Sequence, residues 1–91
     1  METRVAVMGI IVENMDSVEL LNSLLHEFGE FIIGRMGIPY RRRGISIVSI
    51  AIDAPQDVIS ALAGKIGNLD GISVKTAYSN VIGISENDNG R

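Results

Sequence analysis

Cysteine and tryptophan are absent from this 91-residue chain, and aromatic residues make up only 4% of it. The absence of cysteine excludes a disulfide framework, a thiolate nucleophile and any iron–sulfur or zinc–thiolate site. No apolar run reaches the roughly 18 residues that a membrane-spanning helix requires. The N-terminus METRVAV also lacks the basic lead of a secretory signal. We therefore expect a cytoplasmic protein.

Basic charge is also scarce, since eight Lys and Arg face eleven Asp and Glu and the formal net charge is -3. Direct nucleic-acid binding, which needs many basic groups acting together, is not expected. The single histidine, His26, stands near the end of a predicted helix. We expect it to have a structural or capping role there rather than to contact a ligand or metal. No residue spacing suggests a nucleophile beside a base or a set of metal ligands. We expect neither an enzyme nor a cofactor.

What the chain does have is a regular apolar pattern, 46% of its residues being hydrophobic. Continuous apolar runs predict buried strands, and an apolar stripe behind Asp16 as N-cap, with Glu19 in capping-box register, predicts a helix. The predicted order is strand, helix, strand, strand, helix, strand: Arg4–Val12, Asp16–Phe28, Phe31–Ile38, Ile45–Asp53, Pro55–Ile66 and Ile72–Tyr78. Asp53 or Ala54 is expected to cap the second helix.

This order is typical of the ferredoxin-like βαββαβ sandwich, an α+β fold with a four-stranded antiparallel sheet and two helices on one face. We assign residues 1–80 to this domain and 81–91 to a polar C-terminal tail. The first and third strands are apolar on both sides, which leaves one apolar sheet face uncovered. Burying about six side chains there contributes on the order of 10 kcal/mol, enough to meet association costs of ~4–15 kcal/mol. We expect a dimer or tetramer.

Half of the basic residues stand in the segment Phe31–Gly44, as Arg35, Arg41, Arg42 and Arg43. Guanidinium groups concentrated there predict a surface for an anion or a partner, with a solvated hairpin turn as the alternative. Arg35 differs from the others because it lies within an apolar strand. It must meet either an internal carboxylate or the anion of a ligand, and both alternatives stay open.

Several further residues bear on binding. An internal carboxylate for Arg35 could come from the acids Glu13, Glu30 and Asp53. Tyr40 can stack on a planar ligand or pack against another subunit. Gly64 interrupts a good helix, which suggests close packing against a backbone or a ligand, and Gly64-Lys65 lacks the other residues of a phosphate loop.

The segments RVAVMGIIVEN, LLHEFGEFIIGRMGIPY, GISIVSIAIDAPQDVISALAGKIG and GISVKTAYS carry a resemblance over about Arg4 to Ser79. They are similar to the family of iron-only hydrogenase system regulators, small stand-alone domains resembling ACT domains. The resemblance implies an oligomeric, non-catalytic regulatory domain that senses a small anionic or amino-acid-like ligand or a regulatory protein partner. ACT ligands often bind at the loop after the first strand, here Glu13–Ser17, although its usual Pro-Gly pair is missing.

The residues and the resemblance together give six candidate ligand-binding residues: Asn14, Arg35, Tyr40, Arg41, Gly64 and Lys65. Two other functions remain as alternatives. One is an interaction or scaffold module without a small-molecule ligand. The other is a metal-responsive domain, because the fold resembles that of nickel-responsive repressors, whose histidine-and-cysteine site has no counterpart in this sequence.

Overall fold

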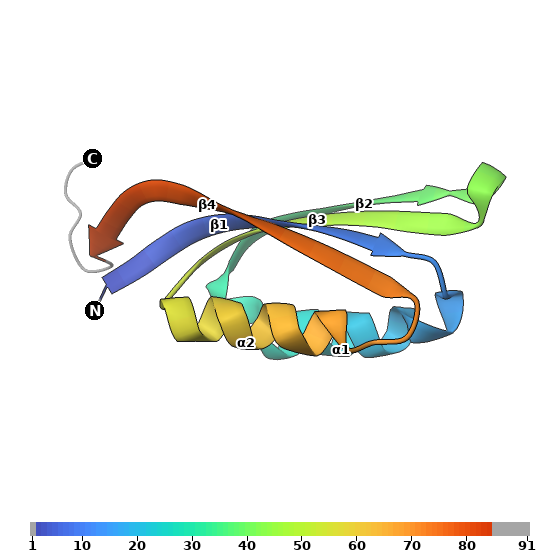
Figure 1. Ribbon diagram of the computed structural model, residues 1–91, viewed down its shortest axis with the longest axis horizontal. Helices are drawn as coiled ribbons and strands as arrows, with labels where there is room; N and C mark the ends of the chain where they lie inside the picture. The colour runs from blue at the N-terminus through green and yellow to red at the C-terminus, as the bar shows by residue number, and fades with distance from the viewer. Residues whose placement is uncertain (1, 85–91) are drawn as a thin grey trace.

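The computed structural model describes residues 2–84, in which four strands and two helices follow one another in the order that the sequence predicts (Figure 1). The sheet is antiparallel throughout, with the strand order β2-β3-β1-β4. Both helices cover one face of it. The predicted α+β ferredoxin-like sandwich is therefore confirmed. The elements are β1 (Glu2–Val12), α1 (Val18–Glu27), β2 (Ile32–Tyr40), β3 (Ile45–Ala54), α2 (Gln56–Gly67) and β4 (Ile72–Ile84).

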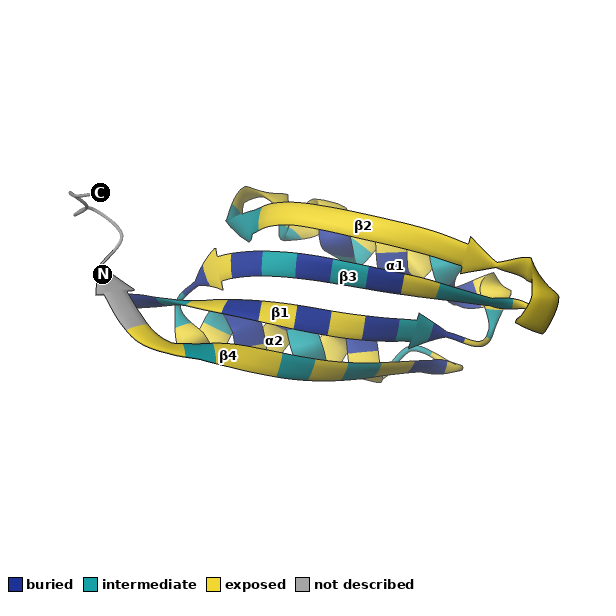
Figure 2. Cartoon of the chain, turned by 90° about the horizontal axis from the view of Figure 1, so that it is seen from above, coloured by how far each residue is buried: buried dark blue, intermediate teal, exposed yellow. Residues whose placement is uncertain are grey.

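The hydrophobic core lies between the sheet and the helices. Every second residue of β1 and β3 points into it, so buried and exposed positions alternate along these two central strands (Figure 2). The predicted apolar stripes of both helices supply the other half of the core. The fully or nearly fully buried residues are Ala6, Met8, Ile10, Val12, Leu21, Leu25, Val48, Ile50, Ile52, Ala54, Ile59, Leu62, Ile66 and Ile72.

The start of α1 differs from the prediction, because Asp16 is not its N-cap. A short 3-10 turn, η1 (Met15–Ser17), precedes the helix, and the Asn14 side chain caps that turn by accepting a hydrogen bond from the Asp16 backbone N–H at 3.0 Å. Ser17 instead donates its hydroxyl to the backbone carbonyl of Asp70 at 2.7 Å. The tertiary contact with the turn before β4 thus replaces the local capping box.

The second helix and the last strand also have different limits. Pro55 precedes α2 without a side-chain cap, so neither Asp53 nor Ala54 has the predicted capping role. Strand β4 continues to Ile84, past the expected domain end at residue 80, because it pairs with the first residues of β1 beyond a register shift. The rest of the expected tail, residues 85–91, lies outside the described residues.

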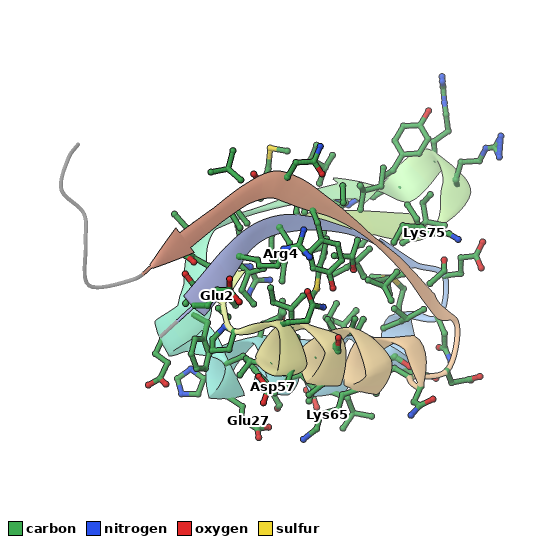
Figure 3. All side chains as sticks on the ribbon, turned by 60° about the vertical axis from the view of Figure 1, so that its left-hand side comes forward. Glu2, Arg4, Glu27, Asp57, Lys65 and Lys75 are labelled. Atoms are coloured by element: carbon green, nitrogen blue, oxygen red, sulfur yellow. The ribbon has the colours of Figure 1, made fainter. Side chains whose placement is uncertain are left out.

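Arg4 links the sheet to α2 beside this register shift (Figure 3). Its guanidinium donates to the Gln56 side chain at 3.3 Å and to the Ser79 carbonyl at 3.0 Å, and it lies 4.8 Å from the centroid of the Tyr78 ring. These contacts give the Arg4 side chain a structural role. Neither described helix has the length and apolar character needed to cross a membrane.

Candidate functional site

A groove separates α1 from the edge strand β2. Strand β2 pairs with β3 alone, and its residues Arg35, Gly37 and Pro39 share the helix side of the sheet, Arg35 opposite the buried Ile50. Because Gly37 has no side chain, no β2 side chain fills the space below α1 at that point. The resulting hollow has a volume of about 270 Å³. We call it the α1–β2 groove.

The walls of the α1–β2 groove are mostly apolar, and its polar groups come from three side chains. Arg35, Asn22 and Ser46 supply a guanidinium, an amide and a hydroxyl, while no Asp or Glu of residues 2–84 lines the hollow. The apolar lining comes from β1, η1, α1, β2 and β3: Val12, Met15, Val18, Leu21, Gly37, Ile38, Pro39 and Val48.

Arg35 spans the groove to α1, where its Nη2 donates to Oδ1 of Asn22 at 3.2 Å. A second hollow of about 370 Å³ lies beyond this pair, and it is lined by Leu25, His26, Gly29 and Ile32 together with Asn22 and Arg35. No carboxylate from the described part of the chain lines this hollow either. Arg35 is exposed, so water still reaches its head group.

Of the two alternatives for Arg35, the internal carboxylate gains no support from residues 2–84, where no Asp or Glu pairs with Arg35 and the salt bridge found joins Lys65 to Glu27 at 4.0 Å. Asp53 is opposite Val5 on the sheet face away from the helices, whereas Arg35 lies on the helix face. Glu13 and Glu30 are exposed and make no ion pair with Arg35. A ligand anion therefore remains the open alternative.

The other five candidate residues do not join Arg35 at one site. Asn14 holds the cap of η1 and donates to the Asp70 carboxylate at 2.8 Å, which is a structural role. Tyr40 lies at the end of β2 on the face away from the helices, and Arg41 lies in the following turn η3 (Arg41–Arg43). The cluster predicted for residues 35–43 is thus divided, because Arg35 points to the helix side while the other arginines form the hairpin tip.

Gly64 and Lys65 lie on α2, away from the α1–β2 groove. Lys65 is 4.0 Å from the Glu27 carboxylate and 5.7 Å from the centroid of the Phe28 ring, on the outer side of the helices (Figure 3). Gly64 is exposed, and apart from its chain neighbours and the backbone of its own helix, no heavy atom of residues 2–84 lies within 4 Å of the position that a Cβ would occupy. The close packing predicted for Gly64 is therefore wrong within the chain.

Asn22, Ser46 and Gly37 were not predicted as site residues. Strand alternation could have placed Gly37 beside Arg35 on one face of β2. The pairing of Asn22 with Arg35 had no such signal, because it depends on how α1 packs over the sheet edge.

The sheet face away from the helices, which we call the open face, is exposed over most of its length (Figure 2), and several large apolar side chains lie on it. Val7 is 46% exposed, Ile38 47% and Ile47 37%, and Met36 reaches 58%. These values are high for large apolar side chains on three neighbouring strands. The register sorts the open face into rows across the sheet: Gly34, Ala51, Val7 and Ala77; then Met36, Ser49, Gly9 and Lys75; then Ile38, Ile47, Ile11 and Ser73.

Residues 4–76 match the TM1266-like family, described as "Iron-only hydrogenase system regulator, putative". The chain belongs to this family. Its structure is similar to that of the uncharacterized protein TM1266 from Thermotoga maritima, at 34% sequence identity and a TM-score of 0.81, over 84% of this chain and 96% of that one. The family identified from the sequence is thereby confirmed, and its description is that of a regulator.

A second similar structure is a formyltetrahydrofolate deformylase from Pseudomonas putida KT2440, at 14% identity and a TM-score of 0.61. The match covers 85% of this chain but only 29% of that enzyme, so the likeness shows the fold alone. No curated protein matches the chain. Within residues 2–84, no group of three or more His, Asp or Glu side chains is placed to hold a metal ion.

Proposed function

We propose that this protein is a non-catalytic regulator of the iron-only hydrogenase system that assembles with copies of itself and senses a small anionic ligand. The observation that carries the proposal is the α1–β2 groove, where one guanidinium stands among apolar walls and no carboxylate of residues 2–84 neutralises it. A guanidinium has five N–H donors, and the structure shows one hydrogen bond from the Arg35 side chain, to a neutral amide. A small anion would supply the charge and the acceptors that the described chain does not.

Assembly is proposed through the open face, with a second copy of the chain as the occupant. The paired strands span about 19 by 30 Å, on the order of 550 Å² per subunit, from ordinary strand spacings. Two such faces would bury about 1,100 Å², above the roughly 1,000 Å² expected of a specific interface. An apolar face of this size left in water would favour aggregation.

The rows of the open face are suited to a two-fold axis. The row of Gly34, Ala51, Val7 and Ala77 is mostly small, whereas Ile38, Ile47 and Ile11 form a large row on the other side of Ser49 and Gly9. An axis along the row of Met36, Ser49, Gly9 and Lys75 would place the large row of each copy on the small row of the other. Each residue of the axial row would then lie near its own counterpart, with Lys75 at the exposed sheet edge, where water screens the two like charges. Such a self-complementary contact is what a two-fold dimer requires.

Strand β2 gives the two surfaces a physical connection. Arg35 and Gly37 face the α1–β2 groove, while the alternating residues Met36 and Ile38 lie on the open face. Because β2 is held by β3 alone, a ligand that pulls on Arg35 can move β2 against the neighbouring subunit. Ligand binding and assembly are therefore expected to be coupled.

An interaction module without a small-molecule ligand is the second candidate function. It is favoured by the hairpin tip, where Arg41, Arg42 and Arg43 are all exposed and project beyond the helices (Figure 1). Three adjacent guanidinium groups suit an acidic protein surface. The metal-responsive alternative gains no support from the side chains of residues 2–84.

Thermal unfolding in the presence of small carboxylates, phosphates and nucleotides tests the proposal. A ligand at 100 times its Kd stabilises the native state by about 2.7 kcal/mol, so an anion that binds should raise Tm measurably. Arg35→Met should abolish that rise, and Arg42→Met, at the hairpin tip, should retain it. If no anion raises Tm of the wild type, ligand sensing is wrong and the interaction module is favoured.

A further inference from the structure

We infer that the ligand of the α1–β2 groove is an apolar monocarboxylate that lacks an ammonium group, such as a branched-chain 2-oxo or 2-hydroxy acid. This inference rests on the proposed function and names the chemical class that the site would take. It separates the groove from a site for free amino acids, which carry both charges.

The charges around the groove decide against an amino acid. Arg35 is the one charged residue among those lining the 270 Å³ hollow, and the second hollow adds only His26. An ammonium group bound there would find no carboxylate among the described residues that line the groove, and it would stand near a guanidinium of like charge. The neutral oxygens of Asn22 and Ser46 cannot replace a counter-ion, since Asn22 Oδ1 already accepts from Arg35.

A carboxylate suits the same group of side chains. The planar guanidinium of Arg35 can donate two parallel hydrogen bonds to it, which a single amide acceptor cannot use. The Asn22 amide and the Ser46 hydroxyl line the same hollow and offer donors for a neutral oxygen next to the carboxylate. The polar end of the ligand is thus an anion with a neutral neighbour.

The walls and the volume define the rest of the ligand. Val12, Val18, Leu21 and Val48 line the hollow between α1 and the sheet, so the remainder of the molecule must be apolar. At about 30 Å³ for each water-sized unit, 270 Å³ accommodates about nine non-hydrogen atoms. A nucleotide would extend out of the groove, and a phosphate dianion would leave the apolar walls without contact.

Leucine and 4-methyl-2-oxopentanoate provide a matched pair of probes. They have the same number of non-hydrogen atoms, the same carboxylate and the same branched chain. They differ at the carbon next to the carboxylate, which carries an ammonium group in leucine and an oxo group in the 2-oxo acid. Calorimetric titration of the full chain should show the 2-oxo acid binding at least ~10-fold more tightly than leucine. Arg35→Met should weaken that binding at least ~10-fold, while Arg42→Met should leave it unchanged, with circular dichroism verifying the fold of both variants.

Each other outcome overturns the inference in a distinguishable way. Leucine binding as tightly as the 2-oxo acid, with the same dependence on Arg35, would contradict the ligand class and leave the sensing function standing. The same holds if inorganic phosphate binds through Arg35 and the 2-oxo acid does not. If neither probe nor any other small anion binds, the inference and the proposed function fail together.

Discussion

Gly64 lies on the exposed side of α2, three residues before the last residue of the helix, with open space where a side chain would stand. Glycine at such a position lowers helix stability relative to alanine, because it has more backbone freedom to lose. Gly64→Ala should therefore raise the free energy of unfolding by about 0.5–1 kcal/mol. Urea denaturation of the two proteins measures this directly.

Gly71 provides the control for Gly64→Ala. Its φ of 71° lies in the left-handed region, and an added Cβ would come within 2.9 Å of the Asn14 backbone nitrogen. Gly71→Ala should lower stability. A fall in stability for Gly64→Ala as well would mean that a ligand or another subunit covers this side of α2.

Asn14 and Asp16 distinguish the observed cap from the one that the sequence predicted. Asn14→Ala removes the hydrogen bond to the Asp16 N–H and the one to the Asp70 carboxylate, so it should cost about 1–2 kcal/mol. Asp16→Ala removes an exposed side chain and should cost less, within about 0.5 kcal/mol. Chemical denaturation of both variants gives the comparison, and the reverse order would favour the capping box.

At the scale of elements, alternation and apolar runs were sufficient to predict the two helices and the four strands. Strands β1 and β3 show why, since their buried residues recur at every second position, and the stripe of α1 faces the core as predicted. The cap of α1 could not be predicted in this way. It depends on the contact of Ser17 with the Asp70 carbonyl, between residues far apart in the sequence.

The α1–β2 groove was predicted only through Arg35. A guanidinium within an apolar strand is unusual and therefore indicates a role for Arg35. An asparagine on a helix surface is common, so the sequence gives no reason to select Asn22. The groove exists because Gly37 leaves space between β2 and α1, and that space depends on the packing of the helix on the sheet. The other five candidate residues lie outside the groove: Asn14, Tyr40, Arg41, Gly64 and Lys65. Their spacing in the sequence does not predict which helices and strands lie next to one another in the fold.

Filling the groove from β2 gives a prediction at this scale. Gly37→Val adds a β-branched side chain to a strand, on the side facing the groove, where no atom lies within 4 Å of the added Cβ. We expect stability to be unchanged or to rise by up to ~1 kcal/mol, while the binding of small anions is lost. Thermal unfolding with and without 4-methyl-2-oxopentanoate measures both effects.

Gly34 is the matched control, because it lies in the same strand but on the open face. Gly34→Val leaves the groove unfilled and should retain anion binding. Because it alters the small row proposed to contact a second copy, any loss of binding that arises through assembly should be accompanied by a change in the mass measured by light scattering. Anion binding that survives Gly37→Val would show that the ligand occupies another part of the molecule.

For the whole molecule, the open face can be tested without interference from native thiols, since the chain has no cysteine. Ser49 lies in the row proposed to follow the two-fold axis, whereas Ser73 lies at the end of the large row. A short bis-maleimide reagent should therefore cross-link Ser49→Cys into a covalent dimer more efficiently than Ser73→Cys. Equal or reversed yields would contradict this axis, and the two subunits would then meet in another arrangement.

Assembly through the open face is tested by the mass of the protein in solution, measured by light scattering at micromolar concentration. The wild type should be at least a dimer, and Ile47→Lys, which places a charge on the open face, should be a folded monomer. Leu20→Lys is the control, because Leu20 is 59% exposed on α1, outside the sheet, and its replacement should leave the assembly intact. A wild-type protein that remains a soluble monomer would contradict the proposal that the open face joins the subunits.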